Sequence, residues 1–494
     1  MDRNAIEELR KVDVPPALHL IDGVRVAASD GGEMPVVSPI DGSVLTTMAQ
    51  GTAQDAAQAI TAARQAFDDG RWSGMAPSAR KVILLKWADL IDAHALELAV
   101  LGVRDNGTEI SMALKAEPKS AAGTIRYYAE ALDKIYGEIA PTAPGTLGLV
   151  HKTPVGVVGA IVPWNFPLMI GAWKIGPALA AGCTVVLKPA ETASLSLLRL
   201  AELGLQAGLP KGVLNVVCGE GAIVGAAIAE SPDVDVLVFT GSGATGRRLL
   251  QASARSNLKR VYLELGGKSP NIIFADAPDL DEAVAVSASG IFRNSGQVCI
   301  AGSRLLVERS IHDAFVAKLK SMAEAMVVGD PLDPATQAGA VNSDQQLARN
   351  LAFIDEARAA GRDIVCGGTR ILTDTGGYYM APTIVAGVAQ SDRIVQDEVF
   401  GPVVTVQAFD TEDEAIALAN GTELGLAAGL WTSNLSRAHR MIGRLRAGVV
   451  HVNTYGGSDM TVPLGGVGQS GNGHDKSLHA FDKFFDLKTA WIKL

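Results

Sequence analysis

From residue 154 onwards the chain alternates short apolar runs, rich in valine and isoleucine, with segments of helical periodicity. The expected strands are 155–162, 184–187, 213–217 and 234–239, and the expected helices between them are 170–181 and 194–206. Strands separated by helices of this length pair in parallel, because each helix carries the chain back across one face of the sheet. A doubly wound α/β sheet is therefore predicted, and the strands and helices after residue 270 predict a second α/β unit.

Three further segments complete the organisation of the 494-residue chain, which is long enough for two or three domains. Residues 56–104 have helical spacing of apolar and charged positions. Residues 138–152 are rich in proline and glycine and are typical of a hairpin. Residues 484–494 alternate like a strand, and we expect this strand to pair with another subunit.

Charge and cysteine usage exclude several classes of partner. The net charge is −10, with acidic and basic residues interspersed and without a Lys/Arg stripe, which argues against nucleic acid. The four cysteines are far apart and form no CxxC pair, so neither a zinc site nor a disulfide framework is indicated, and no metal is expected. No signal-like apolar core and no run of about 20 apolar residues is present. A cytosolic, reducing location without membrane contact is expected.

Cys299 lies in a loop of small residues, GQVCIAGSR at 296–304. An acidic turn, ELGGK at 264–268, stands upstream. This combination indicates an activated thiolate paired with a carboxylate base, which requires partial exposure and local positive potential. The alternative interpretation is a buried free cysteine.

Two motifs compete for a phosphate- and ribose-binding role. GSGATG at 241–246 follows a strand and precedes a helix, so its backbone N–H groups could approach a pyrophosphate. The usual corollary would place Glu264 on the ribose. VVLKPAE at 185–191 instead places Lys188 and Glu191 just beyond a strand, where they could hold a ribose diol. Its alternative interpretation is a helix cap, with Pro189 stopping the strand.

Six runs together resemble the aldehyde dehydrogenase superfamily, in the family's order and over essentially the whole chain. They are PWNFP at 163–167, KPAE at 188–191, FTGS at 239–242, ELGGK at 264–268, GQVC at 296–299 and EVFGP at 398–402. The resemblance implies a Rossmann-like NAD-binding domain over 1–137 and 155–265, an α/β catalytic domain over 266–470, and a small β oligomerisation flap over 138–154 and 478–494. It also implies a homodimer or homotetramer.

The resemblance implies NAD as cofactor, with NADP as the less favoured alternative. The matching positions are Trp164, Lys188, Glu191, Gly241, Ser242, Gly246, Glu398 and Phe400. Ser242 would bind the pyrophosphate, and Gly243 completes the GxGxxG pattern only by accident. Glu398 would hold the nicotinamide ribose, with Phe400 beside the nicotinamide. Glu191 would share the adenine ribose with Lys188, and its carboxylate would repel a 2′-phosphate.

The resemblance also implies a mechanism. Cys299 attacks the aldehyde carbon, and the resulting oxyanion is held by the Asn165 side chain and the Cys299 backbone N–H. After oxidation to a thioester, Glu264 activates the water that releases the acid, so Glu264 is assigned to the base and not to the ribose. Lys174 and Asp475 match a proton-relay pair, with a solvated ion pair as the alternative.

The C-terminal motifs DMTVP at 459–463, QSGNG at 469–473 and DKSLHA at 475–480 resemble the γ-glutamyl-γ-aminobutyraldehyde dehydrogenase branch. That branch oxidises ω-amino or acylamino aldehydes from polyamine breakdown. Four places depart from its pattern: Leu464 replaces an aromatic residue, Val467-Gly468 an aromatic-Lys pair, Thr108-Glu109 a Lys-Pro pair, and His474 an arginine.

The candidate walls of a substrate tunnel are apolar or aromatic, with ordinary core packing as the alternative for each: Phe166, Trp173, Phe292, Tyr455 and Leu464. Glu109, Glu117 and Asp459 could attract an amine, although a solvated surface acid is the simpler interpretation.

Four alternative functions are weighed. The first is a broad-specificity aliphatic or aromatic aldehyde dehydrogenase. The second is a CoA-acylating relative, against which the base Glu264 argues. The third is a Cys–His thiol hydrolase, for which no histidine has a recognisable motif, and the fourth is a catalytically silent scaffold.

Overall fold

The computed structural model describes residues 2–457 and 459–494. Its first large sheet has seven strands in the order β11-β10-β7-β8-β9-β1-β2. Their bounds are β1 His19–Ile21, β2 Val24–Val26, β7 Val157–Ile161, β8 Thr184–Lys188, β9 Leu214–Val216, β10 Val236–Thr240 and β11 Arg260–Glu264. The four predicted strands, β7 to β10, pair in parallel as expected, and β11, which was not predicted, joins them in parallel. β1 and β2 extend the sheet antiparallel.

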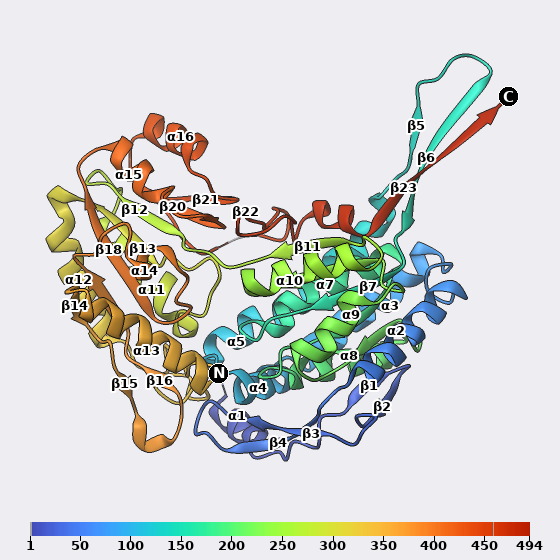
Figure 1. Cartoon of the computed structure of the whole chain (residues 1–494), viewed down its shortest axis with the longest axis horizontal. Helices are drawn as coiled ribbons and strands as arrows, with labels where there is room; N and C mark the ends of the chain where they lie inside the picture. Colours follow the sequence, from blue (N-terminus) through green and yellow to red (C-terminus); the bar gives the residue numbers. More distant parts are fainter. Residues whose placement is uncertain (1, 458) are drawn as a thin grey trace.

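Helices cover both faces of this sheet (Figure 1). Val158 and Ala160 of β7 pack into one helical layer, and Val157 and Ile161 into the other, as the alternation of strand side chains requires. The first layer consists of α3 Pro77–Ala93, α6 Pro118–Ala131, α7 Pro167–Ala181 and α8 Leu195–Ala207, and the second of α2 Ala53–Asp68, α9 Ala226–Glu230 and α10 Gly243–Arg255. Beside the first layer lie α1 Arg3–Arg10, α4 Ala95–Asn106 and α5 Ile110–Ala116.

The second large sheet also has seven strands, in the order β14-β17-β18-β13-β12-β20-β21, and only β14 is antiparallel to its neighbour. The strands are β12 Pro270–Ile273, β13 Arg304–Glu308, β14 Asp363–Cys366, β17 Thr383–Ala386, β18 Val403–Phe409, β20 Ala427–Trp431 and β21 Val449–Val452. The helices are α11 Leu280–Phe292, α12 His312–Ala325, α13 Asp344–Ala359, α14 Arg393–Gln396, α15 Glu412–Ala419 and α16 Leu435–Arg444. The smaller pairs are β3 Glu33–Val37 with β4 Val44–Ala49, β15 Arg370–Ile371 with β16 Tyr379–Met380, and β19 Leu424–Gly425 with β22 Val467–Gly468.

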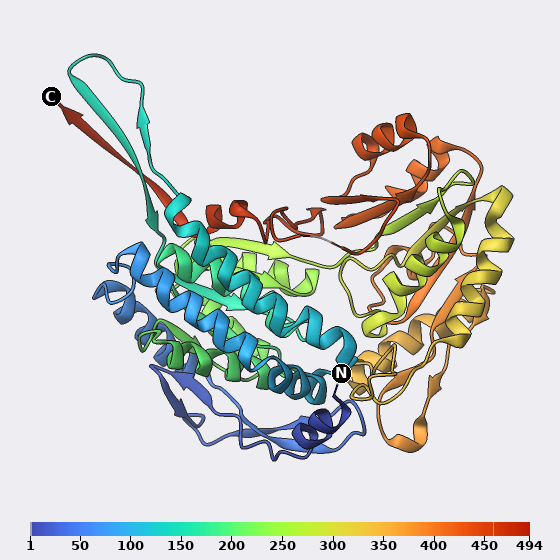
Figure 2. The ribbon, with the colours of Figure 1, turned by 180° about the vertical axis from the view of Figure 1, so that it is seen from behind.

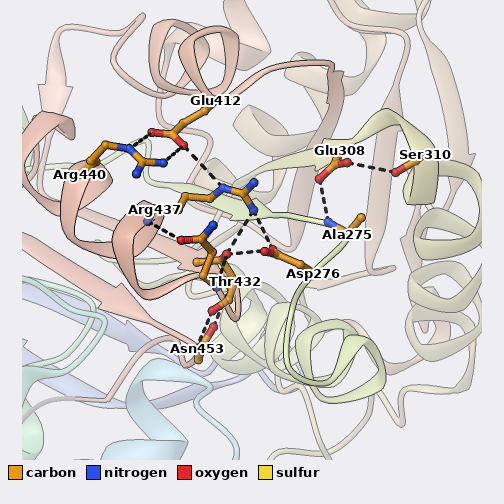
Figure 3. A network of polar contacts seen from close by, with 10 residues as sticks. Ala275, Asp276, Glu308, Ser310, Glu412, Thr432, Arg437, Arg440 and Asn453 are labelled. Carbon is orange, nitrogen blue, oxygen red and sulfur yellow. Dashed lines mark hydrogen bonds and ion pairs between the residues drawn. The ribbon is translucent and has the colours of Figure 1, made fainter.

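Arg437 ties α15 and α16 to the loop after β12 through contacts with Glu412 and Asp276 (Figure 3). It donates to Asp276 and to the Thr432 hydroxyl, and it lies 4.1 Å from the ring centre of Phe274. Glu412 accepts two hydrogen bonds from Arg440. The network stabilises the packing of the two helices and contributes nothing to the site described below.

A three-stranded sheet stands away from the rest of the molecule (Figures 1 and 2). It consists of β5 Glu138–Ala140, β6 Thr146–Pro154 and the C-terminal β23 Phe485–Lys493 in the order β23-β6-β5. Leu487 and Trp491 are both 69% exposed on it, which is unusual for side chains of their size. Among the described residues, no helix is both long and apolar enough to cross a membrane.

The chain passes between the two large sheets twice, through the turn after β11 and again through the segment between β21 and the helix Leu478–Lys483. β11 ends at Glu264, and the glycine turn after it leads directly into β12. The carboxyl ends of β7 and β10 therefore face the second sheet, which is where ligands bind in open α/β folds.

Candidate active site

Cys299 lies between the short helix Arg293–Gly296 and β13, and it lines a cavity of about 140 Å³ between the two sheets. The cavity is lined by Pro163, Trp164, Asn165, Ile170, Thr240, Gly241, Ser242, Leu265, Gly266, Cys299, Gln346, Arg349, Glu398 and Phe400. Six of the other predicted catalytic and cofactor residues therefore share this cavity with Cys299: Asn165, Trp164, Gly241, Ser242, Glu398 and Phe400.

The loop before Cys299 is held in an unusual backbone conformation. Asn294 and Ser295 both have φ near +50°, and a Cβ at Gly296 would overlap the backbone carbonyl of Gly401. Thr108 and Glu109 fix this loop through Asn294. The Thr108 hydroxyl donates to the Asn294 side chain over 2.8 Å, and the Glu109 carboxylate accepts from the Asn294 N–H. Two buried side chains thus replace the Lys-Pro pair at this position.

The electrostatic environment of Cys299 differs from the prediction. Its side chain is partly exposed, as expected. However, burial of the thiol, together with the nearby carboxylates Glu398 and Glu264, raises the pKa of Cys299 to about 12. The charged groups that act on the thiol are therefore negative, contrary to the expected positive potential, and they favour the protonated form of Cys299.

Asn165 is fixed by the loop that carries the cysteine. Its side-chain nitrogen donates to the Gln297 carbonyl over 2.8 Å, and its own carbonyl accepts from the Asn294 amide over 3.4 Å. A side-chain amide carries two N–H donors, so the second remains available to an oxygen beside Cys299.

Glu264 is buried at the end of β11, and its Oε1 has no hydrogen-bond partner within the described part of the chain. Burial and the neighbouring Asp475 raise the pKa of Glu264 well above its ordinary value, while Lys174 and Lys483 act in the opposite direction. A buried carboxyl group with a raised pKa and a free oxygen is typical of a general base.

Lys174 and Asp475 form the predicted pair, but the alternative of a solvated pair is wrong. Lys174 Nζ lies 2.5 Å from Asp475 Oδ2, and both side chains are 1% exposed. The pair has a third member, because Lys483 Nζ lies 2.5 Å from Asp475 Oδ1. Lys483 was not predicted, since a lysine eight residues after an aspartate gives no recognisable signal.

The glycine turn leads into α10, where Ser242 caps the helix by accepting from the Thr245 N–H. A Cβ at Gly241 would lie 2.5 Å from the Phe239 ring, and one at Gly246 would lie 3.0 Å from Leu265. The space around Gly243 is different, because a Cβ there would meet only the flexible end of Arg247. The buried Thr240 hydroxyl has no partner among the described residues.

Lys188 and Glu191 form an ion pair of 2.9 Å just beyond β8. Glu191 also accepts from the Gly221 N–H over 2.5 Å, and its side chain remains 32% exposed. Neither residue lines the 140 Å³ cavity that contains Cys299.

Glu398 accepts from the Gly267 N–H over 3.0 Å, and burial raises the pKa of Glu398 to about 7. Phe400, at φ +63°, packs edge-to-face on Trp164 with ring centres 5.2 Å apart. Two residues of α13 hold this segment: Arg349 donates to the Glu398 carbonyl and Gln346 to the Phe400 carbonyl. Neither residue was predicted from the sequence, because neither lies in a motif and α13 is distant from the other site residues along the chain.

The candidate tunnel residues do not line this cavity. Phe166, Trp173 and Leu464 belong to one buried cluster, Phe292 belongs to another, and Tyr455 donates its hydroxyl to the Ile300 carbonyl over 2.8 Å. Partly buried apolar side chains that were not among the candidates pack against the first cluster: Met112, Met169, Val298, Ile300 and Met460.

The interpretation of Glu109 and Glu117 as solvated acids is wrong. Both are buried, and burial raises the pKa of Glu109 to about 7 and that of Glu117 to about 8. Glu117 accepts from the Leu168 and Met169 N–H groups and so caps α7. Asp459 is exposed, as expected.

Comparison with known proteins decides the family. The sequence profile described as "Aldehyde dehydrogenase family" matches residues 26–490. The chain belongs to the aldehyde dehydrogenase family. The predicted family and fold class are therefore confirmed, and the Cys–His hydrolase alternative is wrong.

Three relatives illustrate the similarity of this aldehyde dehydrogenase to known proteins. The NADP/NAD-dependent aldehyde dehydrogenase PuuC of Escherichia coli is 49% identical over 96% of this chain and 95% of its own. A crystal structure of indole-3-acetaldehyde dehydrogenase with NAD+ is 49% identical, with TM-score 0.98 and full coverage of both chains. The γ-glutamyl-γ-aminobutyraldehyde dehydrogenase of Burkholderia cenocepacia is 47% identical, with TM-score 0.97 and full coverage of both.

This aldehyde dehydrogenase is NAD-dependent, and its cavity fits the cofactor. The α10 N-terminus presents backbone N–H groups beside glycines where a Cβ would collide with the protein's own side chains. The unpartnered Thr240 hydroxyl and the buried Glu398 carboxyl supply polar groups for a ligand with phosphates and ribose hydroxyls. When bound, NAD accepts the hydride that leaves the substrate carbon.

Proposed function

We propose that this enzyme oxidises an ω-amino or γ-glutamylamino aldehyde to the carboxylic acid, with Cys299 as nucleophile and Glu264 as the base for hydrolysis. One observation carries the chemistry: Cys299 lies in the same cavity as Asn165, Ser242 and Glu398, and the Glu264 carboxylate acts electrostatically on the Cys299 thiol. A nucleophile, an oxyanion donor and a cofactor cradle in one cavity are the parts that aldehyde oxidation needs.

The proposed reaction begins when Cys299 Sγ bonds to the aldehyde carbon and its proton is lost. The free N–H of Asn165 and the Cys299 backbone N–H stabilise the oxyanion. Oxidation leaves an acyl thioester on Sγ. Glu264 then takes a proton from water, whose oxygen attacks the thioester carbon, and passes that proton to the departing Sγ, which releases the acid and the thiol. The proton that Sγ loses in the first step passes to Glu264, and Lys174 and Asp475 relay it away from there.

The cofactor contacts are proposed residue by residue. Lys188 and Glu191 bind the adenine ribose, and Ser242 with the backbone of Gly241 and Gly246 binds the pyrophosphate. Glu398 holds the nicotinamide ribose, while Phe400 and Trp164 pack beside the nicotinamide. The Glu191 carboxylate, fixed by Lys188 and the Gly221 N–H, disfavours a 2′-phosphate and so favours NAD over NADP.

The substrate class rests on similarity to the Burkholderia enzyme and on Asp459, an exposed carboxylate adjacent to Met460 of the apolar cluster. Asp459 accepts from the Thr461 N–H and hydroxyl through Oδ1, but it is exposed and would attract the amino end of such an aldehyde. Glu109 and Glu117 are buried against backbone N–H groups. Phe166, Trp173, Phe292, Tyr455 and Leu464 remain the proposed tunnel walls. Leu464 is smaller than the aromatic residue of the branch, and the similarity to indole-3-acetaldehyde dehydrogenase makes bulky aromatic aldehydes the second candidate.

The deciding experiment follows NADH formation by the wild type and by Cys299→Ala without CoA. The substrates are 3-aminopropanal, 4-aminobutanal, its γ-glutamyl derivative, hexanal and indole-3-acetaldehyde. Activity that requires Cys299 and is strongest on the amino or acylamino aldehydes supports the proposal. A preference for hexanal or indole-3-acetaldehyde would overturn the substrate class but not the mechanism. Turnover only after CoA is added would overturn the hydrolytic step.

We also propose that the chain forms a homodimer or homotetramer through the β5-β6-β23 flap. The exposed Leu487 and Trp491 support this proposal, since large apolar side chains on a projecting sheet are typical of an interface.

A further inference from the structure

Asp475 is held between two lysines from different parts of the chain. Lys174 comes from α7 and binds Oδ2, and Lys483 comes from the short helix Leu478–Lys483 and binds Oδ1, each over 2.5 Å. The side chains of Lys174, Asp475 and Lys483 are 1%, 1% and 4% exposed. Water therefore screens these charges little, and their sum matters for any other charge nearby.

The charges of the three groups do not balance among themselves. Two ammonium groups face one carboxylate, which leaves one positive charge in a buried site. Glu264 is the next carboxylate, and it interacts electrostatically with all three groups. Burial lowers the pKa of Lys483, whereas Asp475 and Glu264 act in the opposite direction. Because an uncompensated buried charge is costly, an ionised Glu264 would supply the negative charge that the two lysines leave unmatched.

We infer that Lys483 is a positioning residue that acts across Asp475 as the counter-charge of the Glu264 carboxylate, and so keeps Glu264 available as a base. The inference rests on the proposed role of Glu264. Lys174 offsets Asp475, and Lys483 supplies the remaining positive charge.

The other titratable groups around the cluster come from several elements. Tyr128 of α6 donates its hydroxyl to the Ser477 carbonyl and faces Asp475, and Cys299 faces Glu264. On its outer side, Lys483 borders a surface cavity of about 330 Å³ that is shared with Tyr262, His474, His479 and Asp482. This cavity gives room for replacing the Lys483 side chain without disturbing α7.

The test measures deacylation directly. p-Nitrophenyl acetate acetylates Cys299, the acetyl-enzyme is isolated, and its hydrolysis is followed across pH without cofactor. In the wild type the rate of deacylation should rise with pH as Glu264 ionises, and this rising part of the pH–rate profile is called the limb. Lys483→Met should move the limb to higher pH by about one unit, so that hydrolysis at a pH below the limb becomes about tenfold slower. Lys483→Arg should leave the limb in place. Asp475→Asn should move it to lower pH, because the removed carboxylate opposes ionisation of Glu264.

Glu264→Gln separates the inference from the proposed function. If Glu264→Gln retains the wild-type limb, Glu264 is not the base and the proposed function fails together with the inference. A second outcome overturns only the counter-charge role of Lys483. In that outcome Glu264→Gln loses the limb, but Lys483→Met either leaves the limb in place or moves it to lower pH, as Asp475→Asn is expected to do. Thermal unfolding of each variant checks folding. If Lys483→Met does not fold, Asp475→Asn decides alone, and a limb that stays or rises overturns the inference.

Discussion

The backbone N–H of Gly267 donates to the carboxylate of Glu398 over 3.0 Å. This bond joins the turn after Glu264 to the segment that carries Phe400, so the proposed base and the proposed nicotinamide contacts are positioned by one another. The arrangement leaves no room beside the turn, because a Cβ at Gly266 would overlap the Glu398 carboxylate.

Gly266→Ala is therefore expected to displace Glu398 and weaken NAD binding. The loss should be roughly tenfold to a hundredfold in Kd, the value of one hydrogen bond to a charged group. Isothermal titration of the purified variants with NAD measures it. Gly123→Ala is the matched control, since a Cβ at Gly123 on α6 meets no atom within 4 Å. An unchanged Kd for Gly266→Ala would remove Glu398 from the binding site.

The free thiol of Cys299 is expected to react slowly at neutral pH. With a pKa of about 12, raised by burial and by the carboxylates Glu398 and Glu264, roughly one thiol in ten thousand is ionised at pH 8. Iodoacetamide alkylation of the cofactor-free enzyme, read by mass spectrometry of the Cys299 peptide, should accelerate about tenfold per pH unit from about pH 7 to about pH 10. A plateau within that range would show that the thiolate is already formed.

The sequence predicted the parts of the site that follow from strand ends and compact motifs. Cys299, Asn165 and Glu398 each lie in a short motif that can be recognised in the sequence. The structure brings all three into one cavity. The sequence could not predict Gln346 and Arg349, which reach the site by packing of α13. It also misjudged Glu117, because a carboxyl group that caps a helix looks the same in sequence as one in solvent.

Glu191→Gln is expected to relax the preference for NAD. The substitution removes the negative charge but keeps a side chain that can accept from the Gly221 N–H. The ratio of kcat/KM for NADP to that for NAD should rise by about tenfold, because one repulsive charge pair near the surface is lost. Initial rates with both cofactors measure the ratio, and a fall in NAD use without any gain for NADP would instead indicate a structural role.

Trp491→Asp is expected to break the proposed assembly without unfolding the protomer. Trp491 is 69% exposed on β23, so the substitution removes no core packing but places a charge in the proposed interface. Light scattering should show a smaller particle than the wild type. Val82→Asp on α3 is the control, since Val82 is 67% exposed on the main body and should leave the mass unchanged.

Lys174→Met is expected to destabilise the fold far more than the loss of an exposed ion pair. Asp475 would keep only Lys483 as a partner in a buried site, and breaking such a pair costs about 3 kcal/mol. Arg309→Met, which removes an exposed pair with Asp410, should leave the urea midpoint unchanged.

The destabilisation caused by Lys174→Met should also depend on pH. Lys174 and Lys483 hold the pKa of Asp475 below its ordinary value despite burial, so the stabilisation is present above the unfolded pKa of about 4 and is lost as the pH falls through the folded value. Urea unfolding should therefore show a constant gap between wild type and Lys174→Met near neutral pH that narrows in acid, whereas a gap that widened in acid would show that Asp475 is not the ionised partner.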